Sequence, residues 1–215
     1  MFRIGTWRKD DWAVCAFWVD DETGIGSLQE LDRVEEMFRR KYGISGEGEL
    51  RWTLGIKVTR DFDKHMVSIS QQSYIESLVE RFGLQNAHAV TAPLIPGAII
   101  TKDQCPTTPE EAEEMGNTFY RELIGSLQYV SLATRPDITV AVNKLAQFLA
   151  NLRRAHLDNA LRVLRYLKGT KHWSLNLGGD VADIAGFSNS DWGGDRDDRK
   201  STGAYVFRMG DRAVS

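Results

Sequence analysis

The order of apolar patterns along the chain constrains its fold more strongly than any single residue. Two strand-like runs joined by a polar turn precede an apolar repeat at helical spacing, and the same succession then occurs a second time. The resulting order, two strands and a helix followed by two strands and a helix, favours an α+β domain with an antiparallel sheet. It argues against a sheet built from alternating strand and helix units.

The first of these strand pairs ends at two adjacent carboxylates. Its strands are predicted in FRIGTW and WAVCAFWV, with RKDD as the turn between them, and Asp20 and Asp21 follow the second strand. The residues ETGIG after the carboxylates are typical of a solvated turn. SLQE at Ser27–Glu30 matches a helix capping box, and an amphipathic helix is then expected to run to Gly43.

The second strand pair is predicted in RWTLGIKVTRD and KHMVSIS, with DFDK as its turn. A helix beginning near Ser70 and ending at Gly83 follows. From Ala87 to about Asn117 the chain holds four of its five prolines and a group of acidic residues, which predicts a linker or surface loop.

The remainder of the chain is predicted to be helical and then extended. Three helical runs span Phe119 to Lys171, separated by TRPD at Thr134–Asp137 and by NLRRAH at Asn151–His156. Strand-like sequence returns at Trp173 and includes the charged turn GGDRDDRK. We expect a β-meander in this last segment.

Charge and composition exclude several classes of protein. The net charge of -3 reflects 27 basic and 30 acidic residues, so any affinity for nucleic acid or an anionic membrane must be local. With no membrane-spanning run, no signal-peptide pattern and only two cysteines, we expect an intracellular protein in a reducing compartment. The four histidines show no metal-ligand spacing, which favours solvated or capping roles.

One local surface is strongly basic. Asp158 is the single acidic residue among six cations on and beside the last predicted helix: Arg153, Arg154, Arg162, Arg165, Lys168 and Lys171. Such a face can track phosphates, and it is equally typical of a solvated helix surface with cations near its C-terminus. The adjacent carboxylates are similarly open to two interpretations, a solvated turn or ligands for a divalent metal in phosphoryl transfer.

Several sequence motifs that occur in a fixed order bear on the interpretation of the carboxylate pair and the basic helix. They include FWVDD, LGIKVTRD, ISQQSYIESLVERFGL, YRELIGSLQYVSLATRPDI, LRVLRYLKGTK and GFSNSDWGGDRDDRKSTGAYVF. In this order the chain resembles the Pol polyprotein of copia-type retrotransposons from about residue 11 to residue 210. The resemblance implies four segments: 1–95 as the C-terminal part of a reverse-transcriptase domain, 96–116 as an acidic linker, 117–171 as a helical connection and 172–215 as an incomplete RNase H-like start.

The same resemblance assigns roles to individual residues. Asp20 and Asp21 correspond to the family's pair of catalytic Mg²⁺ ligands, while Trp18 stands where the family usually has Tyr. A third carboxylate would come from an upstream strand, and without it we expect weak Mg²⁺ binding because this ion needs several converging anionic ligands. In the RNase H-like segment Asn189 replaces the first Asp of the family's carboxylate cluster. Asp191 matches the next Asp and is expected to be structural or peripheral.

We therefore expect a fragment of a Pol protein that is related to RNA-directed DNA polymerase and inactive alone. The resemblance implies an RNA/DNA template-primer as partner, a complementing Pol chain, no membrane, and the cytoplasm or nucleus as location. The alternatives are a non-catalytic nucleic-acid-binding module that uses the basic helix, and a relic without activity. Sheet edges left uncovered in such a fragment predict poor solubility.

Overall fold

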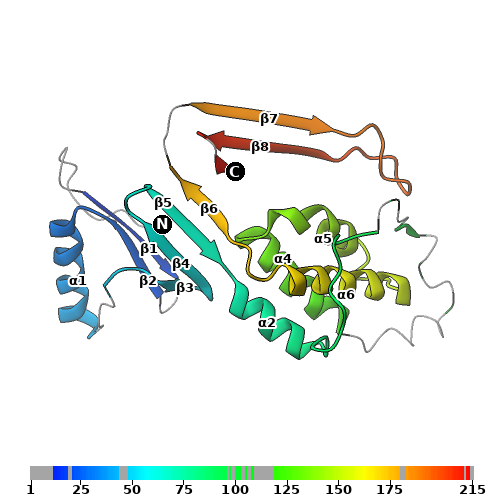
Figure 1. Ribbon diagram of the computed structural model, residues 1–215, viewed down its shortest axis with the longest axis horizontal. Coiled ribbons are helices and arrows are strands. Elements are labelled where there is room, and N and C mark those ends of the chain that lie inside the picture. The colour runs from blue at the N-terminus through cyan, green and yellow to red at the C-terminus, as the bar shows by residue number, and fades with distance from the viewer. Residues whose placement is uncertain are drawn as a thin grey trace. The chain divides into compact units, whose positions relative to one another are not determined.

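The computed structural model describes residues 12–18, 21–43, 48–95, 97, 100–102, 105, 108, 119–179, 183–210 and 212–213. It is a mixture of helices and antiparallel sheets (Figure 1), which confirms the α+β class at this level. The chain divides into two compact units, 1–58 and 59–215.

The first unit is a hairpin backed by one helix. Strand β1 (Ala13–Trp18) pairs antiparallel with β2 (Asp21–Gly26), and helix α1 (Leu28–Tyr42) follows. A small apolar cluster joins the hairpin to the helix, and its members are Ala13, Cys15, Phe17, Leu31, Val34 and Phe38. Helix α1 ends as predicted at Gly43, which has φ 69° and donates its N–H to the Arg39 carbonyl.

Two predictions for this unit are wrong, and FRIGTW lies outside the described residues. The residues ETGIG form most of strand β2 instead of a turn, because the backbone ladder to β1 outweighs the weak strand propensity of glycine. The capping box at Ser27–Glu30 does not form. Ser27 is the residue before α1, but its hydroxyl makes no capping hydrogen bond and is buried without a partner among the described residues.

The predicted strand RWTLGIKVTRD is also interrupted. It forms β3 (Trp52–Thr53) and β4 (Ile56–Asp61), because Leu54 and Gly55 make a tight turn with φ 49° and 74°. Strand β5 (Met66–Ser70) follows the DFDK turn, in which the Asp61 carboxylate accepts the Lys64 N–H. The hydrogen-bonded order of this sheet is β3-β4-β5-β6, where β6 is the later strand Leu175–Gly178.

The second unit contains the main core. Its helical elements are α2 (Gln72–Arg81), α4 (Tyr120–Ala133), the 3₁₀ turn η2 (Pro136–Ile138), α5 (Thr139–Ala146) and α6 (Arg154–Gly169). Leucine side chains from α4, α5 and α6 are fully buried between these helices. The middle helix is shorter than predicted, since it ends at Ala146 and leaves Leu149 outside it, before the predicted separator at Asn151. Within the part of the chain that is described, no helix combines the length and apolar character needed to cross a membrane.

The C-terminal strands differ from the predicted meander in one respect. The strands are β6 (Leu175–Gly178), β7 (Ile184–Ser190), β8 (Gly203–Met209) and β9 (Arg212–Ala213). Strands β7, β8 and β9 form an antiparallel meander, but β6 pairs with β5 instead of β7. Gly178 permits this pairing, because a Cβ there would lie 2.3 Å from the His65 carbonyl oxygen.

Candidate functional site

The predicted catalytic carboxylates follow strand β1 in the sequence. Trp18 and Asp21 are the last paired residues that the structure describes in the β1–β2 ladder. Asp20 lies outside the described residues, and so does the side chain of Asp21. Their assignment as Mg²⁺ ligands stays a prediction.

Within the hairpin, sequence reasoning missed an interaction between the buried Cys15 thiol and the half-buried Glu22 carboxyl. Cys15 is 1% exposed and burial raises the pKa of its thiol, with the charge of Glu22 and a hydrogen bond to it acting in the same direction. Burial also raises the pKa of Glu22, and the nearby Glu35 adds to this rise. The side of the hairpin that meets α1 therefore disfavours negative charge.

The described side chains do not by themselves form a metal centre. No group of three or more His, Cys, Asp or Glu residues with a metal-binding arrangement is found among the described residues. Any Mg²⁺ at the β1–β2 turn would therefore depend on Asp20, Asp21 and ligands from elsewhere.

Cations at the end of α6 are used to dock a distant segment. The Lys168 ammonium donates to the carbonyl oxygens of Leu84, Gln85 and Ala87 at 3.2, 2.6 and 2.8 Å. Arg165 donates from Nε to the His88 carbonyl at 2.7 Å. These contacts satisfy the backbone of the loop that follows α2 and leave less of either cation for phosphate.

The other predicted phosphate-binding residues have mixed surroundings. Lys171 pairs with Glu76 of α2 at 2.7 Å, and Arg154 pairs with Asp158 one helical turn away at 2.9 Å. Arg153 is the N-cap residue of α6, and the Nε of Arg162 is buried without a hydrogen-bond partner in the described structure. The six cations therefore do not share one solvent-facing role, which the sequence could not reveal because the acceptors come from distant segments.

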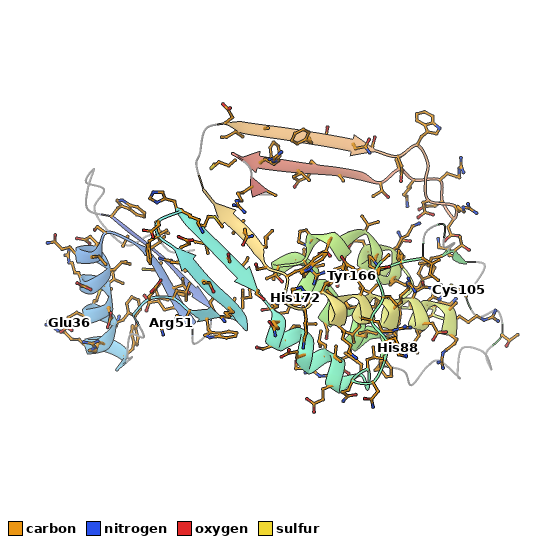
Figure 2. The ribbon with its side chains drawn as sticks, viewed as in Figure 1. Glu36, Arg51, His88, Cys105, Tyr166 and His172 are labelled. Carbon is orange, nitrogen blue, oxygen red and sulfur yellow. The ribbon has the colours of Figure 1, made fainter. Side chains whose placement is uncertain are left out.

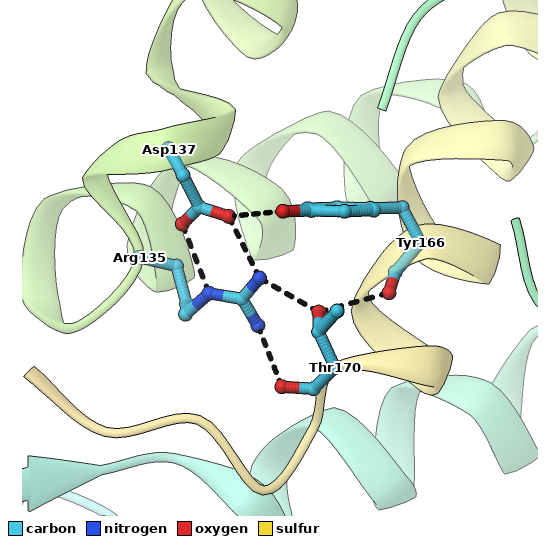
Figure 3. Close-up of polar contacts among 4 residues, drawn as sticks. All are labelled: Arg135, Asp137, Tyr166 and Thr170. Carbon is cyan, nitrogen blue, oxygen red and sulfur yellow. Dashed lines mark hydrogen bonds and ion pairs between the residues drawn. The ribbon is translucent and has the colours of Figure 1, made fainter. Parts of the chain in front are cut away.

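A buried arginine is the centre of a polar cluster of four residues (Figure 3). Arg135 is 2% exposed, and its Nε and Nη2 donate to the two carboxylate oxygens of Asp137 at 2.9 and 2.8 Å. Its Nη1 and Nη2 also donate to the backbone carbonyl and hydroxyl of Thr170 at 3.1 and 2.7 Å. Arg135 and Asp137 therefore form an ion pair in which the guanidinium is buried and the carboxylate is partly exposed.

Aromatic rings complete the surroundings of this guanidinium. It lies 5.4 Å from the ring centre of Tyr166 and 5.2 Å from that of Trp173. The Tyr166 hydroxyl donates to Asp137 at 2.8 Å. Burial alone would raise the pKa of Asp137, but the hydrogen bonds from Arg135 and Tyr166 outweigh it and hold that pKa below its ordinary value. This geometry ties η2 to the end of α6 and is structural in character.

The histidines do not gather into a site. His65, His88 and His172 are exposed, and Figure 2 shows His88 and His172 on separate segments. His156 is fully buried and accepts the Arg153 N–H at 3.0 Å through Nδ1. The predicted capping role is therefore confirmed for His156.

The two residues assigned to an RNase H remnant lie on and beside β7. Asn189 is exposed and pairs with Ala204 across the β7–β8 ladder. Asp191 follows the strand, and its carboxylate accepts the N–H groups of Gly194 and Thr202 at 3.2 and 2.8 Å. Asp191 therefore holds the base of the β7–β8 turn.

Comparison with known proteins gives close relatives over most of the chain. The chain is 33% identical over 208 residues to the retrovirus-related Pol polyprotein from transposon TNT 1-94 of Nicotiana tabacum, a match that covers 96% of this chain and 16% of that protein. It is 33% and 31% identical to the Pol polyproteins from transposons RE1 and RE2 of Arabidopsis thaliana, over 82% and 86% of this chain and 12% of each relative.

Two other comparisons gave no match. No family model matches the chain, and no solved structure matches it. The relatives are much longer proteins, and the chain spans no more than 16% of their length. Within that span, the identity over nearly the whole chain identifies it as a member of the retrovirus-related Pol polyprotein family of copia-type transposons.

Proposed function

We propose that this chain is a portion of a Pol protein that contributes the C-terminal part of a reverse-transcriptase domain, a helical connection and the beginning of an RNase H-like domain. The observation that carries this proposal is the 33% sequence identity to a Pol polyprotein over 208 residues, which is 96% of the chain. The β1–β2 hairpin supports it, because an antiparallel pair of strands that includes Asp21 in its ladder is a suitable frame for metal-assisted nucleotidyl transfer.

In this proposal Asp20 and Asp21 are two of the metal ligands, and the chain is inactive alone. Two neighbouring carboxylates bind Mg²⁺ weakly, because the ion keeps its water shell unless further anionic ligands converge on it. A complementing Pol chain would supply the remaining carboxylate and the contacts to the incoming nucleotide. The partner of the completed site is an RNA template paired with a DNA primer.

Primer extension tests this proposal. The purified chain with Mg²⁺, an RNA template, a DNA primer and nucleotides is expected to give no extension. Adding a chain that carries the upstream part of a relative's reverse transcriptase is expected to restore it. Asp20→Asn or Asp21→Asn should abolish that activity, while Asp32→Asn on the exposed side of α1 should not.

Two outcomes would contradict the proposal. Extension by the isolated chain that is lost in Asp21→Asn would show that the site is already complete. Restored extension that survives both Asp20→Asn and Asp21→Asn would show that these carboxylates are not the metal ligands.

The alternative function is a non-catalytic nucleic-acid-binding module that uses the basic residues of α6. The contacts of Arg165 and Lys168 with the 84–88 backbone weigh against it, since these cations already have acceptors. A salt titration of oligonucleotide binding distinguishes the two: phosphate contacts predict a smaller salt dependence in Arg162→Ala and Arg165→Ala. An unchanged dependence in correctly folded variants would exclude this use of the helix.

A further inference from the structure

Residues 191–202 join β7 to β8 (Figure 1) and carry the most exposed large apolar side chain of the described residues. Trp192 is 95% exposed, whereas Trp52 and Trp173 are 52% and 48% exposed. An indole left in water is unfavourable, because tryptophan is normally packed in a core or placed at an interface. Trp192 is therefore a candidate contact residue for a partner outside this chain.

Hydrogen bonds hold the backbone on both sides of this indole. The Asp191 carboxylate accepts the Thr202 N–H at 2.8 Å, and the Asp191 N–H donates to the Thr202 carbonyl at 3.1 Å. On the other side, the Gly193 N–H donates to the Ser201 hydroxyl at 3.0 Å. Because the residues before and after Trp192 are fixed, the ring is presented to solvent at a defined point of the turn, and less order has to be gained on binding.

Two arginines of the 191–202 turn are available for an anion. Lys200 pairs with Asp198. Arg196 and Arg199 are exposed and form no ion pair with a carboxylate of the described residues. The Nε and Nη2 atoms of Arg199 are each 3.7 Å from the position that a Cβ would take on Gly193. This guanidinium is therefore held beside the backbone from which the indole projects.

The acidic residues of the turn bind donors within the structure. The Asp195 carboxylate accepts the N–H groups of Asp197 and Asp198 at 2.8 and 3.3 Å. The Asp197 carboxylate accepts the Lys102 N–H at 2.9 Å. With Asp191, the turn has four acidic residues and three basic ones. This balance gives no long-range attraction for an anion, so any affinity must arise from close contact.

An unpaired nucleobase fits these observations better than a protein surface does. A protein contact usually buries an aromatic residue within a larger patch whose rim excludes water. Here the chain neighbours of the indole are Asp and Gly, and the last cross-strand pair before the turn is Ser190 with Gly203, which offers no apolar side chain. A base stacks on one exposed ring without such a patch, and a phosphate beside it accepts hydrogen bonds from a guanidinium.

We propose that the 191–202 turn is a contact site for a single nucleic-acid strand, in which a base stacks on Trp192 and neighbouring phosphates bind Arg199 and Arg196. Every base has a face that can stack, so the site does not discriminate between sequences. The inference rests on the proposed function only for the chemical class of the partner. The contact uses neither the predicted metal ligands nor the basic residues of α6.

Binding of a fluorescent oligothymidylate of about 12 nucleotides to the intact chain tests the site, with fluorescence anisotropy as the measurement. A chelator in the buffer removes divalent metal, so the result is independent of the metal site in the proposed function. A second probe of the same length has abasic sugars and keeps every phosphate. The unaltered chain should bind the thymidine probe more tightly than the abasic probe, because only the first can stack.

Three variants assign the contact. Trp192→Ala should weaken binding of the thymidine probe by about 5- to 150-fold and leave binding of the abasic probe unchanged. Trp52→Ala, which removes another exposed indole, should bind both probes like the unaltered chain. Arg199→Ala should reduce the slope of log affinity against log salt concentration by about 0.7, the value for one phosphate contact on a single strand.

Equal affinity of the unaltered chain for the two probes would overturn the proposal, as would absence of binding or unchanged binding in a folded Trp192→Ala variant. If Trp192→Ala does not fold, fluorine spectra of the chain labelled with fluorotryptophan decide the question. The Trp192 signal, identified by its loss in Trp192→Phe, should shift with the thymidine probe and stay in place with the abasic probe. Self-association that depends on Trp192, without binding of either probe, would show a protein contact and would also overturn the proposal.

Discussion

The helical core and the β7–β8 hairpin belong to the same unit and obtain their order from different sources. In the helical core, side chains such as Leu127 and Leu145 are 0% exposed and packed on several sides. In the hairpin every residue of β7 is exposed, and Phe187 is 57% exposed. The hairpin is ordered by its backbone ladder and by the polar contacts of its turn.

This difference teaches that an apolar residue stabilises a fold only where other side chains pack against it. The hairpin carries Ile184, Phe187 and Phe207, which by composition alone match the core residues. Their exposure means that little apolar area is removed from water, so they contribute little free energy of folding. An isolated two-stranded ribbon is marginally stable for the same reason.

The largest difference between the helical core and the β7–β8 hairpin is expected when one apolar side chain is removed from each. Leu127→Ala should lower the free energy of unfolding by about 2–5 kcal/mol, because it leaves a cavity between packed helices. Phe187→Ala should change it by no more than about 0.5 kcal/mol. Denaturant unfolding followed by helical circular dichroism measures both, and equal losses would refute the contrast.

A second test sets the ion pair of the buried Arg135 guanidinium against a pair in which both partners are exposed. Arg135→Ala should cost about 2–3 kcal/mol, because it removes four hydrogen bonds donated by a buried charged group. The matched change Arg154→Ala also breaks an Arg–Asp pair, but both partners are exposed, and the expected loss is about 0.3–0.5 kcal/mol. A small loss in Arg135→Ala would contradict the structural role assigned to the cluster.

The pH dependence of stability sharpens the role of Asp137 in the core. Its pKa is below the ordinary 3.8 in the folded state, so its contribution is complete above that pH and is lost as pH falls through the folded pKa. Unfolding measured between about pH 5 and about pH 2.5 should show this loss in the unaltered chain. Tyr166→Phe should reduce the loss, since it removes one hydrogen bond to the carboxylate, and an equal loss in the two proteins would contradict this account.

The smallest expected effect concerns the turn of the hairpin. Asp191→Ala removes the acceptor of two backbone N–H groups and should lower the local stability of residues 191–202 by about 1 kcal/mol, measured by hydrogen exchange. Asp191→Asn keeps the oxygen that accepts both bonds and should retain most of the protection. Helical unfolding should be unchanged in both variants, and a coupled loss in α4 would show that hairpin and core are one cooperative element.

Much of the fold could be predicted because its signals are local. The apolar spacing after Ser27 and the terminating Gly43 act within one or two helical turns, and α1 follows them closely. The strand β2 was missed because pairing with β1 overrides local turn propensity. The partner of β6 was missed because sequential strands usually pair with each other, whereas here β6 returns to β5.

For the candidate site, the sequence predicted residues through the family resemblance but not their distant contacts. Asp20 and Asp21 were identified from the order of family motifs along the sequence. Their roles as metal ligands stay predictions. The pairing of Arg135 with Asp137 is a local contact, because the two residues are two positions apart. Its bonds with Thr170 could not be foreseen, because that residue is 35 positions away.

The sequence by itself determined the family, the α+β character and the approximate helices, because identity and periodicity are properties of short stretches read in order. The tertiary structure alone decided that the Lys168 ammonium binds backbone carbonyls, that the Arg135 guanidinium lies beside aromatic rings, and that the His156 ring caps α6. The physical reason is that a charge acquires its role from the groups that surround it after the chain has closed. Lys168 and the Leu84 carbonyl that it contacts are 84 positions apart in the sequence.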